Sequence, residues 1–287
     1  MYRTDKRLVE ENIFKTVMML SCLGVIAIFL LMMATVIAKG AGGLSIKLLT
    51  TAPTGGYIAG AASGGILNAI LGSVYLALGA TFLAGLVAIP VSLFINVYLK
   101  KDSRLATFIR FSFDVLWGIP SIVYGAFGFM IMLFFHMRAS LLAGIITIAL
   151  LELPIMTRAA DGVLKMVPLE LKEVSLSLGA TRFETAFRVI FKQALPGILT
   201  AVLIGFGRGI GDAAAVLLTT GYTDSLPTSL LRPAATLPLA IFFQLGTPFP
   251  EVQQMAYTSA LVLMLIILAI SILSRVLTKR MHKHILR

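Results

Sequence analysis

Arg208 and Asp212, four residues apart, are the residues whose chemistry is hardest to explain by packing alone. They lie in an apolar run that begins near Gly197, and a charge at the centre of a spanning helix costs about 2.5–3.5 kcal/mol on insertion scales. A guanidinium offers paired donors in a planar fork that fits two oxygens of an oxyanion. Arg208 is therefore the predicted substrate contact. Asp212 shares its helical face and can hold it through an ion pair, although a purely structural pair remains the alternative.

Glycines alternate through the same stretch, at Gly205, Gly207, Gly209 and Gly211. Each weakens a helix by roughly 1 kcal/mol relative to alanine, and each lets a neighbouring backbone come close. They are predicted to form a gate by close packing or by bending. Pro120, in another glycine-flanked apolar run, is predicted to break or kink its helix, because the freed backbone groups of such a break can line a protected cavity.

The composition identifies an integral membrane protein, predicted to be all-α. Hydrophobic residues make up 58% of the 287 residues and charged residues 13%, against about 25% charged in soluble proteins. The net charge of +11 does not indicate nucleic-acid binding, because the basic residues stand between apolar runs instead of clustering on a soluble face. The single cysteine, Cys22, excludes a disulfide within the chain and a thiolate metal cluster. No metal site and no catalytic residue are predicted.

The spacing of apolar runs predicts about six spanning helices, since a span needs about 20 apolar residues. The first run is longer than a signal-peptide core, so it is expected to remain as a helix, with removal as the alternative. Counted from Gly197 at 1.5 Å per residue, Arg208 lies roughly 16 Å into the fifth run, about half of a ~30 Å membrane core. The six runs cover residues 16–38, 66–99, 107–135, 139–157, 197–220 and 255–273.

The positive charges predict the orientation, because short cytoplasmic segments carry the excess of lysine and arginine. All but five of the 24 fall in the two terminal tails, in the connections that follow the second and fourth runs, or, for Arg110, at the start of the third run. Both termini are therefore predicted to be cytoplasmic. The predicted parts are 1–65 (tail, first helix and outer loop), 66–276 (transmembrane domain, with a cytoplasmic loop at 158–196) and 277–287 (basic tail).

A short amphipathic helix is predicted inside the cytoplasmic loop. Pro168 suits the start of a helix, Gly179 suits its end, and apolar and charged residues alternate at helical spacing between them. Such a helix has three plausible roles: it lies on the membrane surface, it caps its own bundle, or it docks in a groove of a partner protein.

The loop resembles the cytoplasmic loop of permease subunits from ABC importers. Glu173 is followed six residues later by Gly179 and then by an apolar group at 189–191, which is the spacing of that family's motif. The resemblance implies a coupling helix that docks on an ATPase subunit, with Glu170, Glu173, Gly179 and Ala180 at the contact.

Two further segments resemble the phosphate importer permeases. They are Gly-Ile-Pro-Ser-Ile-Val-Tyr-Gly at 118–125 and Arg-Gly-Ile-Gly-Asp-Ala-Ala at 208–214, with additional similarity at 227–230 and 235–238. The resemblance implies a permease that moves inorganic phosphate into the cytoplasm by alternating access, in a prokaryotic plasma (inner) membrane.

The resemblance also implies the partners: a second homologous permease subunit, two ATPase subunits and an extracytoplasmic phosphate-binding protein. The chain has no Gly-x-x-x-x-Gly-Lys-Ser/Thr nucleotide loop. No cofactor is expected on this chain, and ATP and Mg are expected in the ATPase partner. Membrane lipid is the remaining expected contact.

Three other functions fit parts of the sequence. The first is a permease for another oxyanion, and the second is a secondary transporter that works alone, which typically shows two related halves. The third is an intramembrane aspartyl protease, because residues 209–212 read Gly-x-Gly-Asp. That chemistry needs a second aspartate close enough to share a proton, and Asp114 is the candidate.

The acids within the apolar runs are functional candidates by default. Asp114 is kept as a candidate on the substrate pathway, although Arg110, one turn earlier, offers it a simple ion pair. Glu152 is expected near the cytoplasmic end of the fourth run, where it reaches water or pairs with Arg158.

Overall fold

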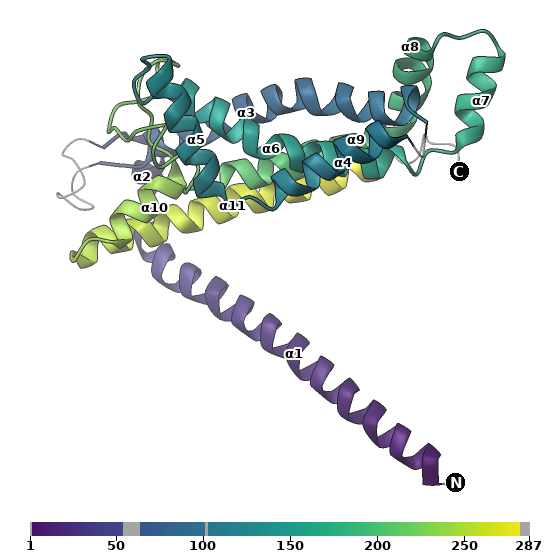
Figure 1. The fold of residues 1–287 in the computed structure, drawn as a ribbon. Coiled ribbons are helices and arrows are strands. Elements are labelled where there is room, and N and C mark those ends of the chain that lie inside the picture. The colour runs from purple at the N-terminus through teal and green to yellow at the C-terminus, as the bar shows by residue number, and fades with distance from the viewer. Residues whose placement is uncertain (1, 54–63, 101–102, 282–287) are drawn as a thin grey trace.

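The computed structural model of the chain describes residues 2–53, 64–100 and 103–281, with side chains over 7–53, 64–100 and 103–276. This part of the chain is helical, as predicted, and its one β-type contact is an isolated bridge between Pro53 and Gly64. The long helices are α1 (Tyr2–Gly40), α3 (Leu67–Leu93), α4 (Arg104–Trp117), α5 (Ser121–Phe134), α6 (Leu141–Leu164), α9 (Phe191–Ile210) and α11 (Pro250–Met281) (Figure 1). The short ones are η1 (Ala41–Gly43), α2 (Ile46–Thr50), the π-helical turns η3 (Phe94–Tyr98) and η4 (Thr185–Ile190), α7 (Leu169–Ser177), α8 (Arg182–Glu184) and α10 (Leu237–Leu245).

Five of the described helical segments are long and apolar enough to cross a membrane, and α4 with α5 forms a sixth if the pair is one broken span. The axes of α4 and α5 differ by 98°. With that pair counted as one span, the six predicted runs are present, and the third is broken at the predicted place. The five continuous segments are Arg7–Gly43, Leu67–Tyr98, Leu141–Leu164, Arg182–Ile210 and Pro250–Val276.

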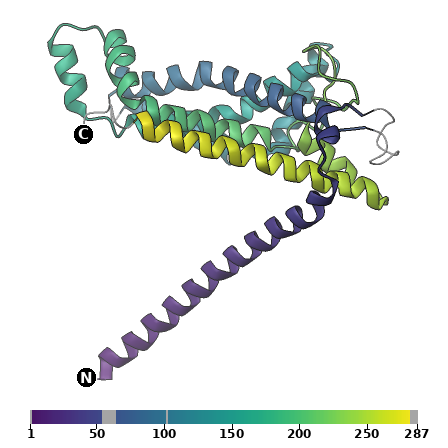
Figure 2. The same ribbon diagram turned by 180° about the vertical axis from the view of Figure 1, so that it is seen from behind.

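The centre of the bundle is the contact between α3 and α6. Small side chains recur on one face of α3, and all of them are buried. Small residues let two helices approach closely where lipid offers no hydrophobic drive for association. α9 and α11 run beside this pair, as both views of the bundle show (Figures 1 and 2). The buried alanines on this face of α3 include Ala77, Ala80, Ala84 and Ala88.

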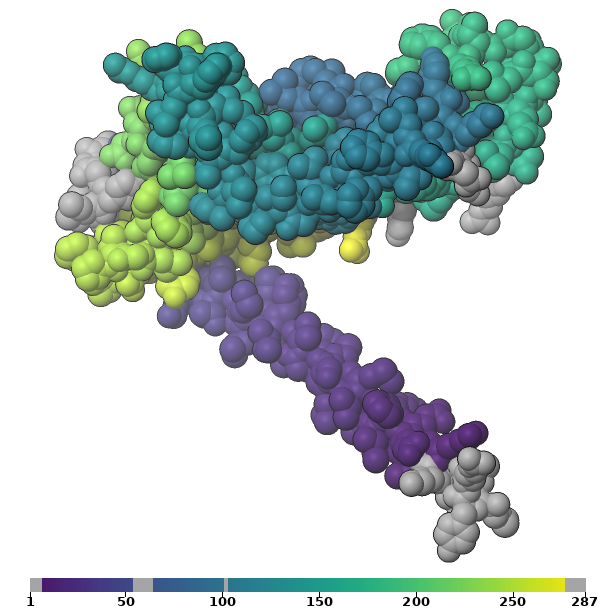
Figure 3. Space-filling model, viewed as in Figure 1, coloured from purple at the N-terminus to yellow at the C-terminus, as the bar shows by residue number. Residues whose placement is uncertain are grey.

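α1 stands apart from the bundle for most of its length (Figure 3). None of its most apolar window is buried. It is attached near its C-terminal end, where Gly40 packs on the backbone of Tyr257 and its carbonyl accepts a hydrogen bond from Thr258 at 3.0 Å. The remaining apolar surface of α1 suits contact with lipid.

The fifth run differs from its prediction, because α9 ends at Ile210 and residues 211–220 form turns. These turns lead back to the start of α6, where the amide of Ser140 donates to the carbonyl of Thr219 at 3.0 Å. Both halves of the run are equally apolar, so hydropathy cannot locate the end of the helix. α6 also runs past the predicted end at residue 157, as far as Leu164.

The predicted helix of the long polar loop is present as α7. It begins directly after Pro168 and ends at Ser177, and Gly179 follows with φ +85°, a conformation that favours glycine. α7 and α8 project at the end of the bundle that the C-terminal part of α11 also reaches (Figures 1 and 2). The division into 1–65, 66–276 and 277–287 stays a prediction, and the side chains of the basic tail lie outside the described residues.

Candidate functional site

Arg208 and Asp212 meet at the C-terminal end of α9. The guanidinium Nη2 lies 3.2 Å from Asp212 Oδ2, and the side chain of Arg208 is 49% exposed whereas that of Asp212 is 3% exposed. The other carboxylate oxygen of Asp212, Oδ1, accepts the backbone N–H of Ala215 at 2.8 Å. The predicted ion pair is therefore present. Asp212 also closes the turn that follows the helix, which the sequence did not suggest.

The end of α9 lies near the middle of α6. Gly209 packs against Glu152 and Ile148, which are central residues of α6. Irregular backbone at membrane depth is tolerated where protein covers it, and Ala215 and Val216 of the following turn are fully buried. Arg208 thus lies at a helix terminus beside the middle of α6, where the C-terminal end of the helix dipole favours a cation, and its depth in a membrane stays a prediction.

The side chain of Arg208 lines a hollow between α9, α6 and the broken α4–α5 pair. The volume, about 310 Å³, suits a small ligand. Arg208 is the one charged side chain among the described residues that line it. A cation surrounded by apolar walls attracts an anion more strongly than it does in water, because the local dielectric is lower. The lining residues are Leu116, Trp117, Ile119, Leu151, Ile155, Ile204 and Arg208.

The break between α4 and α5 is held by hydrogen bonding and packing. Pro120 directly precedes α5 in an extended conformation, with ψ 141°. The Tyr124 hydroxyl reaches back across the bend and donates to the carbonyl of Leu116 at 2.9 Å. A methyl group on Gly125 would lie 2.9 Å from the carbonyl oxygens of both Ala214 and Ala215. The two segments that resemble the phosphate importer permeases are therefore in contact.

The four glycines of α9 lie in different surroundings. Gly209 packs on the carboxyl group of Glu152, and a methyl group on Gly205 would meet the flexible end of Met156 at 2.8 Å. Gly207 has no atom within 4 Å of the place where a methyl group would lie. Gly211 caps the helix end with φ −97°. Two of the four thus permit close packing on α6, and their role as a gate stays a prediction.

The expectation for Glu152 was wrong. Its side chain is fully buried, and neither carboxyl oxygen has a hydrogen-bond partner among the described residues. The cause is the length of α6, which continues to Leu164 and so places Glu152 near its middle. Arg158, the expected partner, instead binds Asp114 and Asp161.

Asp114 does not pair with Arg110 as expected. Its Oδ1 lies 2.6 Å from Nε of Arg158 on α6, whereas Arg110 reaches Asp161 at 3.0 Å. Asp114 is not among the residues that line the hollow at Arg208. No contact with Arg208 therefore supports the prediction that Asp114 lies on the substrate pathway.

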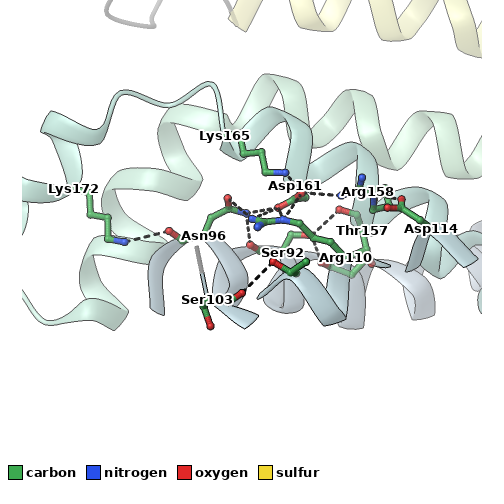
Figure 4. A network of polar contacts seen from close by, with 12 residues as sticks. Ser92, Asn96, Ser103, Arg110, Asp114, Thr157, Arg158, Asp161, Lys165 and Lys172 are labelled. Carbon is green, nitrogen blue, oxygen red and sulfur yellow. Dashed lines mark hydrogen bonds and ion pairs between the residues drawn. The ribbon is translucent and has the colours of Figure 1, made fainter. Parts of the chain in front are cut away.

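Asp161 is the centre of the polar network in Figure 4. Its side chain is 1% exposed and contacts Arg110, Arg158 at 3.1 Å, Lys165 at 2.8 Å and the Asn96 amide at 2.9 Å. Sequence reasoning missed this residue. The available signal was spacing, because Arg158 and Lys165 lie three residues before and four residues after it, at distances that meet on a helix surface.

α7 presents the residues predicted to contact an ATPase. Glu170, Glu173 and Gly179 are exposed, and the amide of Ala180 donates to the carbonyl of Ser175 at 3.2 Å. Exposed apolar side chains lie on the same segment, among them Val174, Leu176 and Leu178. The exposed apolar side chains favour a protein partner over water, because a partner would remove them from solvent.

Lys172 joins α7 to the polar network. Its Nζ donates to the backbone carbonyl of Asn96 at 3.2 Å, and Asn96 in turn binds Asp161. Burial lowers the pKa of the Lys172 ammonium, and the positive charge of Arg182 lowers that pKa further. α7 is thus connected through η3 and α6 to α4, the first half of the broken span.

Residues 88–283 match the family described as binding-protein-dependent transport system inner membrane component. The chain belongs to that family. It is 35% identical over 250 residues to the phosphate transport system permease protein PstA of Yersinia pestis, across 86% of this chain and 82% of that protein. It is 32% identical over 244 residues to the PstA protein of Haemophilus influenzae, across 84% of each.

Solved structures with the same fold come from ABC transporters. Inward-facing conformations of the MetNI methionine ABC transporter match with a TM-score of 0.63 at 17% identity, over 75% of this chain and 95% of that chain. An amino acid ABC transporter with histidines matches with a TM-score of 0.53 at 19% identity, over 75% and 93%. The predicted all-α permease fold is confirmed.

Membership of a transport family removes the main support for the protease alternative. The geometry agrees, because Asp114 and Asp212 are each paired with an arginine of their own and not with one another. The chain is a transport-system membrane component with several spanning helices.

Proposed function

We propose that this chain is a permease subunit of an ATP-driven ABC importer and carries inorganic phosphate by alternating access. The observation that carries the proposal is the similarity to PstA proteins over most of both chains. The arrangement at Arg208 agrees with it, since a single half-exposed guanidinium stands in an apolar hollow near the middle of the bundle.

Arg208 and Asp212 together have the chemistry expected of a site that binds a substrate transiently during transport. Asp212 fixes one side of the guanidinium, while the exposed donors remain free to bind two oxygens of phosphate. A carboxylate nearby weakens the hold on the anion, because like charges repel. Transport needs both properties, since a site must bind its substrate and also release it.

The proposed partners follow from the family. A second, homologous permease subunit would complete the pathway, and an extracytoplasmic binding protein would deliver phosphate. Two ATPase subunits, which use ATP and Mg, would dock on α7, where Glu170 and Glu173 are exposed. The charge bias supports a multi-pass chain with both termini in the cytoplasm, on the side that carries α7.

Uptake by the reconstituted complex tests the proposal. Proteoliposomes that contain the complete importer and ATP, with the binding protein outside, are expected to accumulate labelled phosphate and to exclude labelled sulfate. Liposomes without ATP are the control. Accumulation of sulfate in preference to phosphate would move the assignment to another oxyanion, and uptake by this chain alone would identify a secondary transporter.

A further inference from the structure

A second hollow lies at the end of the bundle that carries α7, and none of its lining residues lines the hollow at Arg208. Its volume is about 340 Å³, and it is enclosed by η3, the end of α6, the start of α7 and η4. The walls are largely apolar, with Leu164, Leu169 and Ile190 among them. A volume of this size accommodates a small ligand or part of a larger one.

Three cationic side chains line this hollow: Arg110, Lys165 and Lys172. They come from α4, from the residue directly after α6 and from α7, so the positive charge comes from three separate parts of the chain. No aspartate or glutamate is among the described residues that line it. Asp161 lies behind the wall with its side chain 1% exposed, and its oxygens already accept from Arg110 and Lys165.

The surrounding charges do not cancel. Arg158 takes part in the same network and shares Asp161, but its second partner is Asp114. Among the described residues of this network, four cations therefore meet two carboxylates. Lys172 has no ion pair within the described part of the chain, and its hydrogen bond goes to a neutral carbonyl. An anion in the hollow would offset this excess and would satisfy the free donors of all three lining cations.

We propose that this hollow is a binding site for a phosphoryl group. Inorganic phosphate has four acceptor oxygens, and a phosphodiester headgroup has two charged oxygens and two ester oxygens, so cations from three parts of the chain can contact one such group at once. Two sources share this chemistry: the headgroup of an anionic phospholipid, and free inorganic phosphate. The apolar walls favour the phospholipid, because they can also cover part of its glycerol and acyl chain, and basic pockets between spanning helices bind such headgroups.

A ligand bound in this hollow would contact three parts of the chain that have different predicted roles. Lys172 lies on the predicted coupling helix, Arg110 on the broken span and Lys165 directly after the central helix α6. A ligand that contacts all three would restrain α7 relative to α4.

The test uses the purified full chain and two probes. Native mass spectrometry measures retention of phosphatidylglycerol against phosphatidylcholine. Equilibrium dialysis measures binding of labelled inorganic phosphate in phosphatidylcholine nanodiscs, in an Arg208→Ala background so that the proposed transport site does not contribute. The variants are Lys172→Gln and Lys165→Gln, and the matched control is Lys192→Gln, which removes an exposed lysine on α9 that does not line the hollow.

We expect Lys172→Gln to weaken binding of one probe about fivefold, the effect of one lysine near an anionic headgroup, and Lys192→Gln to leave it unchanged. Loss of phosphatidylglycerol assigns the site to lipid, and loss of phosphate assigns it to the free anion. If neither probe binds selectively, or if both hollow variants behave like Lys192→Gln, the proposal is wrong. Lys165→Gln serves as the independent variant if Lys172→Gln does not fold, as judged by circular dichroism.

Discussion

Gly209 on α9 lies directly against the carboxyl group of Glu152 on α6, at the level where α9 ends. The contact leaves no room for a side chain at residue 209, and it sets the distance between the helix that carries Arg208 and the centre of the bundle. The neighbouring Gly207 faces open space. Two glycines of the same helix, one half turn apart, thus have opposite tolerance for substitution.

Gly209→Ala is expected to destabilise the chain by about 1–3 kcal/mol, because the new methyl group would overlap Glu152 and would lie 2.8 Å from Cγ2 of Ile148. Gly207→Ala is the matched control and is expected to be neutral or stabilising by up to about 1 kcal/mol. Thermal unfolding in detergent measures both.

Removing the carboxyl group should relieve the overlap at Gly209. The double variant Gly209→Ala/Glu152→Ala is therefore expected to be more stable than the sum of the single changes, with a coupling of about 0.5–3 kcal/mol. Additive effects would show that the methyl group introduced by Gly209→Ala does not displace Glu152.

Arg208→Ala is expected to lower phosphate uptake by about 10–100-fold, the loss of a charge-assisted hydrogen-bonding group worth about 1.5–3 kcal/mol. Arg208→Lys keeps the charge and loses the planar fork, so we expect an intermediate rate. Uptake into proteoliposomes gives the rates, and co-purification of the subunits checks assembly. Unchanged uptake in an assembled Arg208→Ala complex would remove Arg208 from the substrate pathway.

Asp212 has two contacts that substitutions can separate. Asp212→Asn retains an oxygen for the amide of Ala215 and loses the charge that faces Arg208. We expect near-normal stability and altered uptake. Asp212→Ala leaves a buried amide without its acceptor, so a further loss of about 1–3 kcal/mol in stability is expected. Equal unfolding temperatures for the two variants would contradict the role of Asp212 in closing the turn.

Much of the fold was predictable because hydropathy and charge bias report membrane crossing directly. The break at Pro120 and the helix after Pro168 were predictable for a local reason, since proline restricts the backbone on its N-terminal side. The end of α9 at Ile210 was not, because residues 211–220 are as apolar as the helix before them. The segment after the helix is instead held in a turn, with the amide of Ala215 donating to Asp212, and hydropathy does not report such a contact.

The sequence predicted which residues form the candidate site better than it predicted which side chains contact one another there. Arg208 and Asp212 pair at helical spacing, so the sequence carried that contact. Glu152, Asp114 and Asp161 depend on which helices face one another, and tertiary packing decides that. Because the end of α6 was predicted too early in the chain, Glu152 was expected to reach water, whereas the structure places it in the buried centre of the helix.

The network at Asp161 is expected to be important for stability. Asp161→Asn would leave the mostly buried Arg110 without its carboxylate, at a cost of about 3–5 kcal/mol, whereas the half-exposed Lys165 can turn to solvent. Asp114→Asn is the control, since that half-exposed side chain makes one ion pair, worth about 0–1 kcal/mol. Unfolding of the two variants in the same detergent tests this order, and a larger effect at Asp114 would contradict it.

Gly179 connects α7 to α8 with φ +85°, and no atom lies within 4 Å of the place where a methyl group on this residue would point. Space is therefore not the constraint, and Gly179→Ala is expected to cost about 1–2 kcal/mol through backbone conformation alone. Gly162→Ala, in α6, is the matched control, because its surroundings are equally open and its φ is not positive.

Gly179 lies on the surface that we propose binds the ATPase, so strain at this residue would act at that surface. We expect Gly179→Ala to lower stimulation of ATP hydrolysis by loaded binding protein while the subunits still co-purify, and Glu173→Lys to do so by reversing an exposed charge. Gly162→Ala should retain full stimulation. Normal stimulation in both the Gly179→Ala and the Glu173→Lys variants would mean that the ATPase binds another part of the chain. Neither a strained turn after α7 nor a reversed charge on it would then affect the ATPase.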